Sequence, residues 1–178
     1  NKKTDSSNYV YFDNNATTFV CAPAKKAMMD WVSCCNASSD SKMAKPVKHV
    51  LEQASDYILA QCEVSSATHT AVFTSGATES NCFIVRACAK AYKKKLVESD
   101  SILKPHIICS ALEHHSIIEC IKDLEDSGEI DATYIYPTIY GNITPEDVEK
   151  EIKQNTCLIS MMFANNEIPV LTNIKKIG

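Results

Sequence analysis

The sequence predicts an α/β protein in which a mainly parallel sheet is flanked by helices. From about residue 70 onward, short apolar runs alternate with helical segments, which is the pattern of strand–helix–strand units. Apolar residues make up 45% of the 178 residues and charged residues 22%, and there are only four glycines and six prolines. This composition is typical of a folded chain and excludes the disordered, collagen-like and low-complexity classes.

The first segments are predicted to form one short strand and two helices. Residues 9–12 are β-prone and stop at a turn cluster, residues 13–15. Pro23 suits the first turn of a helix that continues to Val32. Between residues 46 and 62, apolar side chains recur at intervals of three and four, which predicts an amphipathic helix with one buried stripe.

The remaining segments alternate between strand and helix. Strands are expected at residues 70–74, 106–109, 133–136 and 157–163, and helices at about residues 78–95, 116–126 and 145–153. Thr144 and Pro145 stand where a helix start favours an N-cap and a first-turn proline, and Gly128 stands where a helix is expected to end. These signals agree with the alternating pattern.

Charge and cysteine content limit the expected partners and compartment. The formal net charge is −4, so neither nucleic acid nor a membrane is expected as a partner. Nine cysteines is an odd number without a CxxC pair, which favours free thiols in the cytoplasm or another reducing compartment and predicts no metal site. No apolar stretch approaches the roughly 18 residues of a spanning helix and no signal-peptide core is present, so we expect no secretion.

Three loops that follow predicted strands carry residues suited to a ligand. In open parallel sheets, ligands collect beyond the carboxyl ends of the strands. In the first loop Gly76 allows a tight turn, and Ala77 and Thr78 open a helix whose free N–H groups and positive dipole end suit a phosphate. The alternative for this loop is that Ser75 or Thr78 simply caps the helix.

The second and third loops offer imidazoles and amides. In residues 112–116, His114 or His115 can stack on a flat cofactor or move protons near neutral pH. In residues 163–167, the side-chain amides of Asn165 and Asn166 can hydrogen-bond a polar ring substituent. For the asparagine pair, capping of the loop itself is the alternative.

Taken together, these motifs resemble the NifS-like cysteine desulfurases of the class V aminotransferase group, which depend on pyridoxal phosphate (PLP). Four segments carry the resemblance in order, namely residues 11–18, 73–81, 112–117 and 165–168, and the similarity continues from Tyr9 over almost the whole chain. The resemblance implies the PLP-dependent transferase fold type I. It also implies an N-terminal arm and substrate-side loop at residues 1–22 and an incomplete large PLP-binding domain at residues 23–178.

The resemblance further implies roles for particular residues. Ala77 and Thr78 are expected to hold the PLP phosphate, His114 to stack on the ring and act as the catalytic residue, and Asn166 to hydrogen-bond the ring hydroxyl, with residues 13–18 near the substrate. The implied reaction removes sulfur from L-cysteine to give alanine and an enzyme persulfide. A homodimer, transfer to a persulfide-accepting scaffold or carrier protein, and a place in sulfur metabolism and iron–sulfur cluster assembly are implied as well.

The Schiff-base lysine and the nucleophilic cysteine of the family are expected beyond residue 178, so none of the nine cysteines is nominated as the nucleophile. Residues 35–44 lack the glycines, proline and histidine of the family's loop, and Phe163 stands where histidine is common. Two alternatives therefore stay open. One is a non-catalytic structural or interaction protein that reuses the domain, which follows if translation ends at Gly178; the other is a different class V enzyme, such as a selenocysteine lyase or an aminotransferase.

Overall fold

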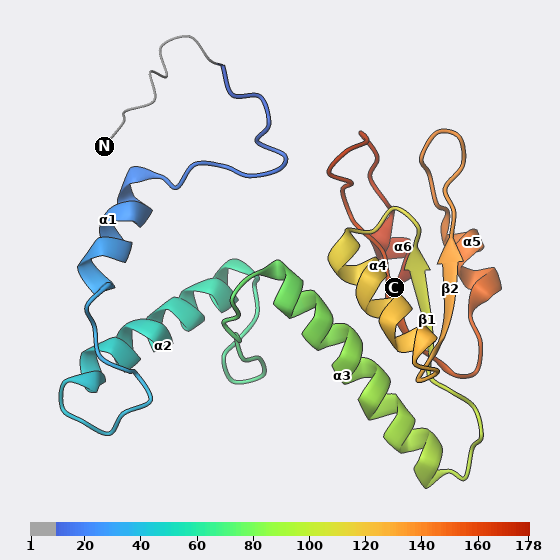
Figure 1. The fold of residues 1–178 in the computed structure, drawn as a ribbon, viewed down its shortest axis with the longest axis horizontal. Helices are drawn as coiled ribbons and strands as arrows, with labels where there is room; N and C mark the ends of the chain where they lie inside the picture. Colours follow the sequence, from blue (N-terminus) through green and yellow to red (C-terminus); the bar gives the residue numbers. More distant parts are fainter. Residues whose placement is uncertain (1–9) are drawn as a thin grey trace. The chain divides into compact units, whose positions relative to one another are not determined.

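A computed structural model describes residues 10–178, which form two compact units divided between Phe73 and Thr74. The N-terminal unit contains helix α1 (Ala22–Trp31) and helix α2 (Ala44–Gln61), with Pro23 in the first turn of α1 as predicted (Figure 1). Helix α1 has no buried residue, and α2 buries only Ala44 and Leu59. The N-terminal unit therefore has little hydrophobic core of its own.

The C-terminal unit is an α/β layer built on one parallel sheet. Its elements are α3 (Ala77–Glu98), β1 (His106–Ser110), α4 (His115–Asp126), β2 (Asp131–Ile135), α5 (Pro145–Glu151), β3 (Thr156–Ser160) and α6 (Ile174–Ile177). The strand order is β2-β1-β3, and both pairings of the central strand β1 are parallel. The predicted fold class, a parallel sheet with flanking helices, is confirmed.

Strand β1 is buried on both faces because helices cover both sides of the sheet (Figure 1). Successive strand side chains point to opposite faces. Ile107 packs in one core cluster with residues of α3 and α4, whereas the next residue, Ile108, packs in a second cluster with Val148 of α5. This two-sided burial explains why the strand has a continuous apolar run rather than alternating polar residues.

A buried histidine links the three strands at their amino ends. The His106 ring is fully buried, with Nδ1 2.8 Å from Thr156 Oγ1 and Nε2 2.9 Å from Thr133 Oγ1. Burial lowers the pKa of His106, and the nearby Lys153 acts in the same direction. Both ring nitrogens are thus satisfied by hydroxyl groups of β2 and β3, which is what a polar ring in a core requires.

The predicted helix boundaries follow local capping chemistry. Thr144 Oγ1 accepts the N–H of Asp147 at 3.2 Å, and the Asp147 carboxylate accepts the N–H of Thr144 at 3.1 Å, which is a capping box at the start of α5. Gly128 follows the end of α4 with a φ of 72°, a left-handed conformation that favours glycine. Both signals from the sequence are confirmed.

Two strand predictions are wrong. Residues 70–74 and residues 10–12 form no strand, and residue 9 lies outside the described residues. Phe73 and Phe12 are exposed, and neither segment has a paired neighbour in the described part of the chain. Local β propensity stabilises a strand only when a ladder partner satisfies its backbone groups.

Among residues 10–178, no helix is long and apolar enough to cross a membrane.

Candidate functional site

The start of α3 has free backbone donors. Gly76 is its N-cap with a φ of 164°, which is extended backbone that any residue can adopt. No side chain of the described residues caps this helix, and the first-turn N–H groups of Ala77 and Thr78 have no carbonyl partner within the helix. The capping alternative for Ser75 and Thr78 is therefore wrong, and the phosphate-binding role of this turn stays a prediction.

Ser75 instead holds the loop against the helix. Its backbone N–H and its hydroxyl both donate to the Glu79 carboxylate at 2.6 Å. These hydrogen bonds, the hydroxyl first, lower the pKa of Glu79. The resulting contacts order the residues that precede the free N–H groups.

His114 is both an exposed imidazole and the N-cap of α4. Its Nδ1 accepts the backbone N–H of Ser116 at 3.1 Å and lies 2.9 Å from Ser116 Oγ. Asn81 of α3 donates from Nδ2 to the same Ser116 Oγ at 2.8 Å. This hydrogen-bond chain joins the N-terminal part of α3 to the first turn of α4, through residues that lie 35 positions apart in the sequence.

The two asparagines after β3 have different roles in the structure. Asn165 Nδ2 donates to the Leu112 carbonyl at 3.0 Å, and Asn165 Oδ1 accepts the N–H groups of Glu167 and Ile168 at 2.8 and 3.0 Å. Loop capping, the alternative interpretation, is therefore correct for Asn165. Asn166 makes no side-chain hydrogen bond to any described residue, so its amide remains available to a ligand.

A cavity of about 230 Å³ brings the second and third loops together. The residues that line it are Ala111, Leu112, Glu113, His114, His115, Ile118, Asn165, Asn166, Glu167 and Ile168. His114 and Asn166 thus face one hollow, as expected. Thr78 and Ala77 are exposed on the first turn of α3 and are not among its lining residues. The cofactor contacts expected of Ala77, Thr78, His114 and Asn166 stay predictions.

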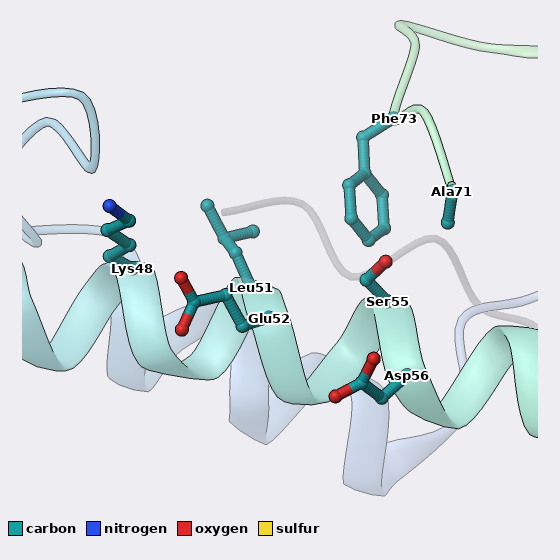
Figure 2. A pocket seen from close by; sticks show the side chains of 7 residues that line it. All are labelled: Lys48, Leu51, Glu52, Ser55, Asp56, Ala71 and Phe73. Atoms are coloured by element: carbon teal, nitrogen blue, oxygen red, sulfur yellow. The ribbon is translucent and has the colours of Figure 1, made fainter. Parts of the chain in front are cut away.

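A larger hollow lies in the N-terminal unit, but it has no matching chemistry. It measures about 460 Å³ and lies along α2, where Phe73 and Ala71 face a row of helix side chains (Figure 2). Its polar residues, Lys48, Glu52, Ser55 and Asp56, have the spacing of an ordinary solvated helix face. None of the predicted site residues lines it, so the smaller cavity is the candidate site.

Gly141 allows the loop after β2 to approach the loop that carries Asn166. Its φ is 82°, and a Cβ at this position would lie 2.8 Å from Ile168 Cδ1 and 2.8 Å from Val170 Cγ2. We expect Gly141→Ala to lower the free energy of unfolding by about 1–3 kcal/mol, because alanine is strained at positive φ and collides with both side chains. Urea denaturation of the two proteins measures this difference. An unchanged midpoint would contradict the close approach of the loops.

Glu113 is a buried carboxyl group that the sequence prediction missed. Its Oε1 is buried and has no hydrogen-bond partner among the described residues. Burial raises the pKa of Glu113, and the N–H of Met162 and the charge of His114 oppose that shift. A glutamate next to the candidate histidine was visible in the sequence, but only the tertiary structure shows that the group is desolvated.

We expect the stability difference between Glu113→Gln and wild type to depend on pH. Because the pKa in the folded state is above its ordinary value of 4.5, the contribution of Glu113 to stability is complete below that value. It is lost as the pH rises through the folded-state pKa. The variant should therefore gain stability relative to wild type between about pH 4 and about pH 8 in urea titrations. A difference that is the same at both pH values would show that the carboxyl group is not desolvated.

Two cysteines of the C-terminal unit, Cys109 and Cys157, are poor candidates for a nucleophile. Burial raises the pKa of Cys109 to about 12 and that of Cys157 to about 11. A thiol must be ionised to attack another sulfur. Cys109 is buried, and Cys157 is half-buried.

The comparisons with known proteins agree with the observed fold. Residues 10–178 match the family model for aminotransferase class V. The cysteine desulfurase IscS of Methanosarcina thermophila is 34% identical over 171 residues, which cover 95% of this chain and 40% of that protein. A solved NifS-like protein has a TM-score of 0.82 at 29% identity, over 94% of this chain and 44% of that chain. The structure of SspA in complex with cysteine has a TM-score of 0.83 at 31% identity, over 95% of this chain and 46% of that chain.

The fold and the family match together define a domain of the PLP-dependent transferase type. The chain belongs to the aminotransferase class-V family, and its expected similarity to NifS-like cysteine desulfurases is confirmed. It spans about 40% of the length of the desulfurase relative described above.

Proposed function

We propose that this chain is the cofactor-binding part of a PLP-dependent cysteine desulfurase. The observation that carries the proposal is the shared cavity of His114 and Asn166, in which the Asn166 amide is free while its neighbour Asn165 is fully used by the loop. The similarity to cysteine desulfurases over nearly the whole chain supports the same reaction class. The domain division at residue 22 and the substrate-side position of residues 13–18 belong to this proposal.

The residues present fit the cofactor. The free N–H groups of Ala77 and Thr78 and the Thr78 hydroxyl suit its dianionic phosphate, because a helix N-terminus favours negative charge. The His114 ring offers a flat face for stacking, and the Asn166 amide can donate to the ring hydroxyl oxygen. When bound, PLP supplies the electron sink that makes the carbon–sulfur bond of cysteine breakable.

The contribution of the protein is to orient groups and to supply a hydrogen-bond donor. Since the Nδ1 of His114 accepts an N–H, the other ring nitrogen, Nε2, bears the proton of the neutral ring and is the atom that can donate a hydrogen bond to the substrate. Asn165 keeps the loop of Asn166 in place through its bonds to Leu112 and Ile168. The Schiff-base lysine and the cysteine that takes the sulfur belong to the proposed remainder of the protein.

The experiment that tests this function uses the full-length product. Purified protein should show the visible absorbance of lysine-bound PLP and should form alanine and sulfide from L-cysteine. Protein that stays colourless with added PLP would contradict the proposal and would favour a non-catalytic protein that reuses the domain. Coloured protein that prefers selenocysteine, or that transfers amino groups, would assign a different class V reaction.

Further parts of the proposal concern assembly and partners. We expect a homodimer that transfers its persulfide sulfur to a scaffold or carrier protein for iron–sulfur cluster assembly in the cytoplasm or another reducing compartment. The persulfide can be followed by incubating the enzyme with labelled cysteine and a candidate acceptor. Light scattering of the pure protein measures the oligomeric state.

A further inference from the structure

The orientation of His114 is set by a defined chain of hydrogen bonds. The backbone N–H of Ser116 can only donate, so the Nδ1 atom that accepts it at 3.1 Å carries no proton. The Ser116 hydroxyl oxygen lies 2.9 Å from the same Nδ1. Since Nδ1 is an acceptor, the hydroxyl proton of Ser116 is directed toward it.

The direction of the Ser116 hydroxyl is fixed from its other side. Asn81 Nδ2, a donor only, lies 2.8 Å from Ser116 Oγ. The hydroxyl therefore accepts from Asn81 with a lone pair and has its own proton free to donate to His114. In this arrangement the chain of hydrogen bonds runs from Asn81 of α3 through Ser116 of α4 to the His114 ring.

The consequence for the ring is a single tautomer. When Nδ1 is an acceptor, the proton of the neutral imidazole lies on Nε2. Nε2 has no hydrogen-bond partner among the described residues. The contacts to Ser116 therefore leave the proton-bearing nitrogen as the free atom of the ring.

We propose that Asn81 and Ser116 are positioning residues: the backbone N–H of Ser116 holds His114 in the Nε2–H tautomer, and the Ser116 hydroxyl, itself held by Asn81, fixes the ring orientation beside the cofactor. The statement rests on the proposed function for its consequence in catalysis, but the tautomer itself is a property of the protein alone. Partners that orient a functional imidazole through its second nitrogen control both which nitrogen carries the proton and where the ring lies.

The first measurement reads the tautomer without reference to activity. Full-length protein labelled with ¹⁵N-histidine, free of PLP, is examined by NMR, and the His114 signals are assigned by their loss in His114→Asn. We expect one acceptor-type signal for Nδ1 and one protonated signal for Nε2. In Ser116→Ala, which keeps the backbone N–H bond to Nδ1 and loses only the hydroxyl contact, the Nδ1 signal should stay of the acceptor type but shift toward that of a more weakly bonded nitrogen. In Ser116→Thr, which keeps the hydroxyl, it should stay in place. Ring signals that are identical in wild type and Ser116→Ala would overturn the proposal.

The second measurement reads the effect on catalysis in the PLP-loaded protein. We expect Ser116→Ala to lower kcat about five- to tenfold, with KM for cysteine and the PLP dissociation constant within about twofold of wild type, and Ser116→Thr to restore kcat. Asn81→Ala should give a smaller fall in the same direction, because the Ser116 hydroxyl remains. The matched control is Ser127→Ala, which removes a hydroxyl bonded to the Leu124 carbonyl at the opposite end of α4.

The outcomes separate this proposal from the proposed function. An equal fall of kcat in Ser116→Ala and Ser127→Ala would assign the effect to helix α4 as a whole and overturn the positioning role. Full-length protein that binds no PLP would contradict the function, while the ¹⁵N spectra would still decide the tautomer.

Discussion

Replacing His114 by asparagine is expected to reduce sulfur release from cysteine by about a hundredfold or more, because the flat ring and its positioned Nε2–H donor are both lost. Asparagine is the sharpest substitution because it removes the ring but keeps a side-chain acceptor for the N-cap of α4, a role that His114 fills with Nδ1. The thermal midpoint should therefore stay close to that of wild type, so that lost activity is not lost folding.

The measurement compares initial rates of alanine formation by full-length His114→Asn, wild type and a control, His49→Ala. His49 is an exposed histidine of α2 in the N-terminal unit. Activity that survives in His114→Asn would remove His114 from the proposed mechanism. Equal losses in both variants would show that the assay does not report on the candidate site.

Replacing Ile107 by alanine is expected to lower the free energy of unfolding by about 2–5 kcal/mol. Ile107 has no exposed surface, and it lies in the central strand β1, where it packs in the same cluster as Val85 of α3 and Ile121 of α4. Loss of the side chain leaves a cavity that the surrounding strands and helices cannot fill without losing their own contacts.

Urea denaturation followed by circular dichroism measures this effect, and the control is Ile139→Ala. Ile139 is 93% exposed in the loop after β2, so its truncation should leave the midpoint almost unchanged. A small effect at Ile107 would mean that β1 is not the centre of the core. That result would also place in doubt the position of the loop that follows β1 and carries His114.

Much of the C-terminal unit was predictable because its signals are local. The intervals of apolar residues and the capping residues Thr144 and Gly128 mark helix ends through contacts within a few residues, and these helices lie close to their expected ranges. Strand β1 has a short continuous apolar run, which is typical of a parallel strand that is covered on both faces. Residues 70–74 have a similar composition but form no strand, because pairing depends on a partner that no local pattern specifies.

The candidate site was predictable in its residue types but not in its assignment of roles. Sequence reasoning placed His114 and the asparagine pair at strand ends, and the cavity brings them together. It did not distinguish Asn165 from Asn166, because the distinction rests on a bond from Asn165 to the Leu112 carbonyl, which lies 53 residues away in the chain. The buried carboxyl oxygen of Glu113 likewise depends on what packs against it.

By itself, the sequence determined the α/β class, the helix ranges, the family resemblance and the chemical groups of the site, since each follows from composition, periodicity or short motifs. The tertiary structure decided which amide is free, which nitrogen of His114 accepts a hydrogen bond and which carboxyl group is desolvated. The physical reason is that hydrogen bonding and burial join groups from distant parts of the chain, and their energies depend on the geometry of that meeting.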